Sequence, residues 1–125
     1  MNRSYVLPFC LGLLLIADRS SAHSKPEATE QEEKAAAESE VKCFFASIER
    51  YDDGISDAAT VGRAVADSCR QTILDVADVY SQGGSRNLVS MMREKFVEEA
   101  PAGAADKVLE VRAYKRNATA HTPQQ

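Results

Sequence analysis

The stretch from Cys43 to Cys69 constrains this chain more than any other. It places two helix-forming segments on either side of a short turn, Asp52 to Asp57, with one cysteine on each segment. Ser56 lies midway between the cysteines, which is the spacing expected for two antiparallel helices joined by a disulfide. That bond would close a loop of 27 residues. Restricting the unfolded chain in this way stabilises the folded protein by about 3.5 kcal/mol.

The N-terminal segment 1–22 has the pattern of a signal peptide. An apolar run of 13 residues, Tyr5 to Ala17, follows one arginine, and small residues precede the expected cleavage between Ala22 and His23. The run is shorter than the roughly 20 apolar residues that cross a bilayer. Retention as an uncleaved anchor is the alternative. We expect an exported protein, periplasmic or secreted, with no stable membrane span after cleavage.

Export favours pairing of the cysteines. Cleavage removes Cys10 and leaves Cys43 and Cys69, whose thiols meet an oxidising environment. The alternative is a dissociable redox pair. The wide separation and the absence of a C-x-x-C motif favour a structural disulfide.

The mature chain is expected to form one all-α domain of three to four helices. Its centre is a disulfide-stapled antiparallel helical hairpin, with a C-terminal helical region packed on it. We assign residues 23–30 to a flexible acidic segment, 31–116 to the helical domain and 117–125 to a disordered tail.

The first helix is expected to begin at a capping box formed by Thr29 and Glu32. The acidic residues around this start are interpreted as a solvated helix entrance, with a docking site for a basic partner as the alternative. Apolar residues at three- and four-residue spacing give the helix one buried face: Val41, Phe44, Phe45 and Ile48.

A second, continuous helix is predicted over 57–80. Ala58, Gly62 and Ala66 form a row of small residues on which a neighbouring helix can approach closely. The bulky residues of the first helix are expected to fill the space above this row. The larger apolar residues of this segment, with Cys69, keep a helical stripe: Ile55, Val61, Val65, Cys69, Ile73, Val76 and Tyr80.

The C-terminal region is predicted to form two further helices. Ser85 caps the third, Pro101 ends or kinks it, and a fourth covers 104–116. Met91 and Met92 are interpreted as core residues rather than copper ligands, because no Met or His partner lies at helical spacing. The basic C-terminal end is expected to attract the acidic N-terminal half, within one molecule or between molecules.

The turn is predicted from local chemistry. Gly54 supplies a left-handed conformation, Asp53 accepts hydrogen bonds, and Ser56 or Asp57 caps the next helix. A calcium loop is excluded because Gly54 and Arg63 occupy positions that need oxygen ligands.

Other chemistry finds no support in the sequence. The formal net charge of −4 argues against nucleic-acid binding, which needs a basic face. Both histidines, His23 and His121, fall in the predicted tails, where no packed neighbours hold them. We therefore predict no catalytic, cofactor-binding or metal-binding residues, and no cofactor.

The segment Asp52-Asp53-Gly54, with Ser56-Asp57-Ala58 and then Ala64-Val65 before Cys69, resembles a pattern in small exported bacterial proteins of unknown function. These proteins share a C…DDG-x-SDA…C core. The resemblance implies a periplasmic helical protein and carries over no catalytic residues.

The expected function is therefore that of a non-catalytic periplasmic or secreted interaction module with an unknown protein partner. One alternative is a helical protein that binds a small ligand between its long helices. A weaker alternative is a redox or hydrolytic enzyme. No motif names the partner or the oligomeric state.

Overall fold

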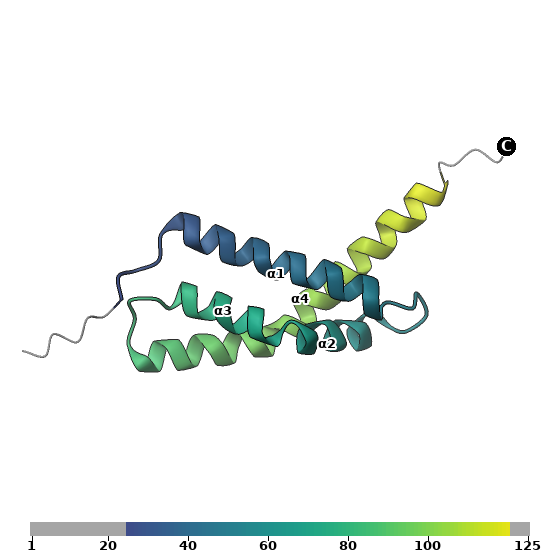
Figure 1. The fold of residues 1–125 in the computed structure, drawn as a ribbon. Helices are drawn as coiled ribbons and strands as arrows, with labels where there is room; N and C mark the ends of the chain where they lie inside the picture. The colour runs from purple at the N-terminus through teal and green to yellow at the C-terminus, as the bar shows by residue number, and fades with distance from the viewer. Residues whose placement is uncertain (1–24, 121–125) are drawn as a thin grey trace, which may run out of the picture.

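The computed structural model describes residues 25–120, which form four helices (Figure 1). The predicted all-α class is confirmed. The expected cleavage site at Ala22 and His23, the whole segment 1–22 before it and residues 121–125 lie outside the described residues. The helices are α1 (Glu30–Tyr51), α2 (Ala58–Ser68), α3 (Arg70–Tyr80) and α4 (Arg86–Ala120).

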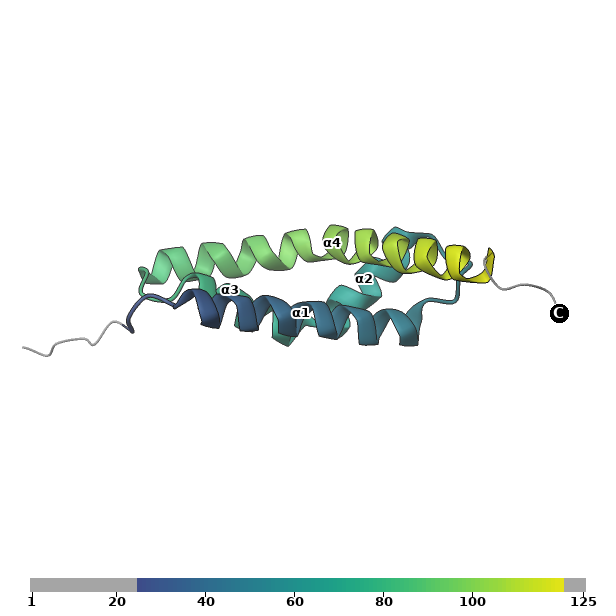
Figure 2. The same cartoon turned by 90° about the horizontal axis from the view of Figure 1, so that it is seen from above.

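The first three helices form an antiparallel hairpin, α1 against α2 and α3, and the long helix α4 packs on it. The chain runs out along α1, returns along α2 and α3, and runs out again along α4, so α1 and α4 point in the same direction (Figures 1 and 2). Helix α4 packs chiefly on α2 and α3, and it makes few contacts with α1. The C-terminal end of α4 extends beyond the other helices (Figure 1).

The start of α1 is the predicted capping box. The Glu32 N–H donates to Thr29 Oγ1, and the Thr29 N–H donates to the Glu32 carboxylate at 2.8 Å. Half of the predicted apolar stripe is wrong, because Val41 and Phe45 stay 39% and 37% exposed while Phe44 and Ile48 are buried. The reason is geometric, since α1 packs on α2 and α3 and leaves the side toward α4 largely uncovered.

The predicted single helix over 57–80 is also wrong, because it is interrupted at Cys69. This residue has φ −96° and ψ 10°, outside helical values. Its N–H still donates to the Val65 carbonyl at 3.0 Å, and its carbonyl accepts from the Ile73 N–H at 3.0 Å. Both backbone hydrogen bonds of Cys69 are therefore kept across the interruption.

The Cys43–Cys69 disulfide lies at this interruption and joins it to α1, with the two Cα atoms 5.9 Å apart. Cys69 is only 1% exposed. The Ser47 hydroxyl lies 3.3 Å from the Cys69 sulfur and 3.3 Å from the Ser68 hydroxyl. The bond is thus part of the hydrophobic core, whose buried members are Phe44, Ile48, Val61, Val65, Ala66, Cys69, Ile73, Ala100, Ala104 and Val108.

Helix α4 continues through Pro101, so the prediction of two helices separated near Pro101 is wrong. Residues 117–120, which were assigned to the tail, are helical as well. Proline removes one backbone donor and costs about 3 kcal/mol in a helix interior. Packing offsets that cost, because residues on both sides of the proline are buried at four-residue spacing: Ala100, Ala104 and Val108.

The row of small residues does admit a neighbouring helix, but the neighbour is α4 rather than α1. A Cβ atom placed on Gly62 would lie 2.7 Å from the Pro101 carbonyl oxygen and 2.7 Å from the Ala105 nitrogen. The expectation that bulky residues of α1 fill the space above the row is therefore wrong. The close contact with the α4 backbone instead positions α4 on α2.

Candidate functional site

The turn between α1 and α2 is built by the residues that the sequence singled out. Gly54 has φ +71°. The Asp53 carboxylate accepts from the Ser56 N–H and hydroxyl, both at 2.7 Å. Asp57 caps α2, since its carboxylate accepts from the Thr60 N–H at 2.9 Å. These bonds satisfy donors that a helix end otherwise leaves unpaired.

Substitution of Gly54 tests the backbone of this turn. We expect Gly54→Ala to lower the free energy of unfolding by about 1 kcal/mol, because a Cβ disfavours positive φ. No atom lies within 4 Å of the position that the Cβ would take, so steric contact contributes nothing. Urea unfolding measures the change. Gly54→Asn is the control, with a smaller loss because asparagine tolerates this conformation. Equal stability of all three proteins contradicts the prediction.

Arg112 of α4 fastens the turn to the rest of the molecule. Its guanidinium donates to Asp52 Oδ1 at 2.5 Å and to the Ser56 carbonyl at 2.8 Å. The Asp52 side chain is 3% exposed. The Arg112 guanidinium holds the pKa of Asp52 below its ordinary value, chiefly by this hydrogen bonding. The expected attraction between the acidic half and the basic end therefore operates within one molecule at this pair.

Acid should weaken the turn. Hydrogen bonds from Ser56 and Ile55 lower the pKa of Asp53 from 3.8 to about 2. A lowered folded-state pKa stabilises the protein above the unfolded value, and this stabilisation is lost as pH falls through the folded value. We expect the melting temperature to fall between about pH 4 and about pH 2, with a shallower fall in Asp53→Asn. Asp67→Asn, at an exposed position of α2, is the control. Identical profiles for wild type and Asp53→Asn contradict the assignment.

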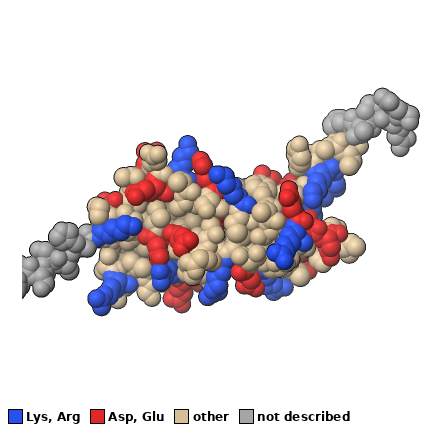
Figure 3. Space-filling view, in the orientation of Figure 1, with Lys and Arg blue, Asp and Glu red and all other residues tan. Residues whose placement is uncertain are grey.

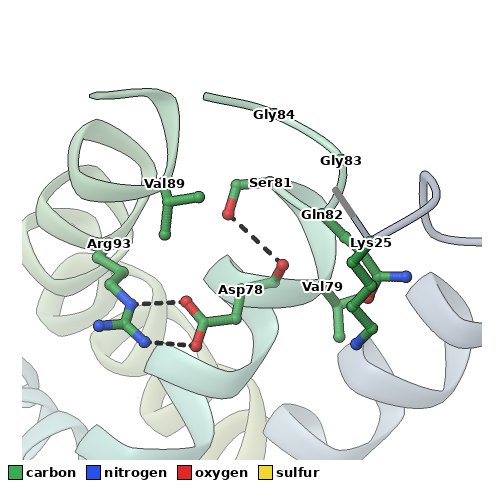
Figure 4. A pocket seen from close by; sticks show the side chains of 9 residues that line it. All are labelled: Lys25, Asp78, Val79, Ser81, Gln82, Gly83, Gly84, Val89 and Arg93. Atoms are coloured by element: carbon green, nitrogen blue, oxygen red, sulfur yellow. Dashed lines mark hydrogen bonds and ion pairs between the residues drawn. The ribbon is translucent and has the colours of Figure 1, made fainter. Parts of the chain in front are cut away.

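A hollow of about 390 Å³ lies where α3 meets α4 (Figure 4). Arg93 points across it and donates to both carboxylate oxygens of Asp78, at 2.6 and 2.5 Å. The guanidinium lowers the pKa of Asp78 by this hydrogen bonding. Because the Arg93 guanidinium is already hydrogen-bonded to Asp78, this hollow is a weak candidate for an anion site. Its other lining residues are Lys25, Val79, Ser81, Gln82, Gly83, Gly84 and Val89.

Two more hollows follow one another along α1 and α4, and together we call them the α1/α4 groove. The Val41–Phe96 hollow has a volume of about 280 Å³ and is lined by Glu40, Val41, Phe44, Phe96, Glu99, Ala100, Gly103 and Lys107. The Phe45–Tyr114 hollow has a volume of about 450 Å³ and is lined by Phe45, Glu49, Glu110, Val111, Tyr114 and Lys115.

The α1/α4 groove combines apolar walls with charged edges. Tyr114 is 75% exposed, and Val41 and Phe45 are more than one-third exposed. Burial raises the pKa of Glu40, which lines the Val41–Phe96 hollow. Large apolar side chains that gather on a surface, with polar groups around them, mark an interaction site. This groove is therefore the candidate functional site.

The sequence did not indicate the α1/α4 groove. Phe45 was predicted to lie on the buried face of the first helix, and Tyr114 lies in the segment 104–116 that was predicted as a separate fourth helix. Met91 was also assigned to the core, but it is 57% exposed. One signal was available, because two adjacent phenylalanines on one helix cannot both point into a narrow contact with a single neighbour.

The rest of the described surface carries charges of both signs. On the face drawn in Figure 3, basic and acidic side chains are intermixed around uncharged areas, without one extended basic surface. Within residues 25–120, no three His, Cys, Asp or Glu side chains gather where they could hold a metal ion. No helix in that range has the length and apolar character needed to cross a membrane.

Comparison with known protein families, curated proteins and solved structures finds no match to this chain. The similarity of its turn segment to small exported bacterial proteins therefore stays a resemblance. Any functional assignment has to come from the geometry of the groove.

Proposed function

We propose that this chain is a small exported, non-catalytic protein that binds a protein partner through the α1/α4 groove. The observation that carries the proposal is the pair Phe45 and Tyr114, aromatic side chains on different helices that line one hollow and remain exposed. Aromatic residues in such hollows dominate the binding energy of many protein interfaces. The Cys43–Cys69 disulfide supports residence in an oxidising compartment.

Binding of a small ligand is the second candidate. The Phe45–Tyr114 hollow, at about 450 Å³, has a size typical of ligand pockets, roughly 300–1,000 Å³. Such pockets usually bury most of the ligand, whereas Tyr114, which lines this hollow, stays 75% exposed. A groove of that form fits a protein segment better than an enclosed small molecule.

Site-specific crosslinking distinguishes the two candidates. A photoreactive amino acid replaces Tyr114 in one variant and Ala59, at an exposed position of α2, in the control. We expect position 114 to yield a discrete protein adduct that position 59 does not yield. The same adducts from both positions would contradict the proposal. A small molecule that copurifies in native mass spectrometry, without a protein adduct at position 114, would favour the ligand reading.

A further inference from the structure

The Phe45–Tyr114 hollow is lined by one acidic and one basic side chain that form no ion pair with another described residue. Glu110 is paired with Lys107 of the same helix at 2.6 Å. Glu49 on α1 and Lys115 on α4 line the same hollow, and neither forms an ion pair with another residue in the range that the structure describes. Lys115 acts on Asp52 only through longer-range electrostatics. The hollow therefore offers an acid on one helix and a base on the other.

The aromatic residues of the Phe45–Tyr114 hollow also come from both helices. Phe45 comes from α1 and Tyr114 from α4, and Tyr114 begins a stretch, 114–120, in which every residue is exposed. This stretch belongs to the end of α4 that extends beyond the other helices (Figure 1). Helices in proteins gain most of their stability from packing on other elements. An end of α4 that buries no side chain gains that stability only when a partner covers it.

We infer that the partner is a second copy of this chain, bound in a two-fold symmetric dimer that joins the two Phe45–Tyr114 hollows. In this dimer Tyr114 of each copy packs on Phe45 of the other, and Lys115 of each copy pairs with Glu49 of the other. A two-fold interface uses the same patch on both subunits, so each of these contacts occurs twice. A patch with one acid, one base and two aromatic residues is complementary to itself in this way. The inference rests on the proposed role of the groove as a docking site.

Sedimentation equilibrium of the purified protein tests the dimer. We expect the average mass to rise with concentration toward twice the monomer mass. Raising the salt from about 0.05 M to about 0.5 M should shift the equilibrium toward the monomer, because exposed ion pairs are screened. Tyr114→Ser should raise the dissociation constant by about tenfold or more. Its fold should be intact, since Tyr114 is 75% exposed, and circular dichroism checks this.

Charge reversal identifies the pairing itself. Glu49→Lys and Lys115→Glu should each weaken the dimer, because each variant places two like charges in contact at both ends of the interface. An equimolar mixture of the two variants should restore association, since both pairs in the mixed dimer regain opposite charges. Asp67→Lys, at an exposed position of α2, is the control and should leave the dissociation constant unchanged.

Two results would overturn the inference. The first is a monomeric mass at every concentration and salt. The second is a dimer that Tyr114→Ser and both charge reversals leave unchanged, because its interface then lies elsewhere. A different protein crosslinked at position 114 of a monomeric chain would leave the proposed function intact and remove only the dimer. Absence of any adduct at position 114, the second copy included, would remove both.

Discussion

Reduction of the Cys43–Cys69 disulfide is expected to lower the free energy of unfolding by about 3.5 kcal/mol. The bond removes conformations from an unfolded loop that joins residues 26 positions apart. That loss is a large part of the roughly 5–15 kcal/mol by which a typical domain is stable. Urea unfolding with and without reductant measures it. At an m-value of about 1–1.5 kcal/mol/M, the midpoint should fall by 2 M or more.

The double variant Cys43→Ala/Cys69→Ala is the control for reduction. It should unfold at a similarly low urea concentration, and reductant should not change its midpoint. Alkylation of the unreduced wild type under denaturing conditions, followed by peptide mapping, should label neither Cys43 nor Cys69. Labelling of both would refute the bond. An unchanged midpoint after proven reduction would show that the disulfide contributes little to stability.

Gly62→Ala is expected to lower the free energy of unfolding by about 2 kcal/mol, a typical cost of overpacking. Its Cβ would approach backbone atoms of α4 at 2.7 Å, and one of its close neighbours is the Ala105 Cα at 2.9 Å. Backbone atoms cannot turn aside as a flexible side chain can, so α4 has to move away from α2. Gly62→Val should cost more and should also loosen α4, which lower protection of its amides from hydrogen exchange would show.

Gly103→Ala provides the matched control for Gly62. Both glycines lie inside helices, but a Cβ on Gly103 meets no atom within 4 Å. Alanine is a better helix former than glycine, so this variant should gain about 0.5–1 kcal/mol. Opposite signs at the two positions would establish that close packing of α2 on α4 causes the loss. A gain at both positions would contradict the interface.

The sequence predicted those parts of the fold that depend on neighbouring residues. Helical periodicity identified the helical segments but not where they are interrupted, the Thr29–Glu32 capping box located the start of α1, and Gly54 located the turn. The break at Cys69 had no local signal, because neither glycine nor proline occurs there. Pro101 gave a misleading signal, since its effect on the helix is outweighed by burial of Ala100 and Ala104 in the hydrophobic core.

The turn and the groove differ in the same way, because one depends on neighbouring residues and the other on packing between distant ones. The hydrogen bonds of Asp53 and Asp57 reach at most three residues along the chain, so turn chemistry indicated them in advance. Arg112 contacts Asp52 from 60 positions away, and no pattern in one sequence specifies that pair. The α1/α4 groove depends on the distance between two helices that hardly touch. Only the three-dimensional arrangement shows which apolar side chains that distance leaves uncovered.

The disulfide adds a covalent link between the first three helices but not to α4. The bond joins α1 to the interruption between α2 and α3, whereas α4 is attached by one loop and by noncovalent packing. Partial opening should therefore begin with α4, which can swing away while the bonded hairpin keeps its shape. Proteolytic cleavage within residues 81–85 would then release α4 as a separate peptide. The uncut chain and the disulfide would still hold α1, α2 and α3 together.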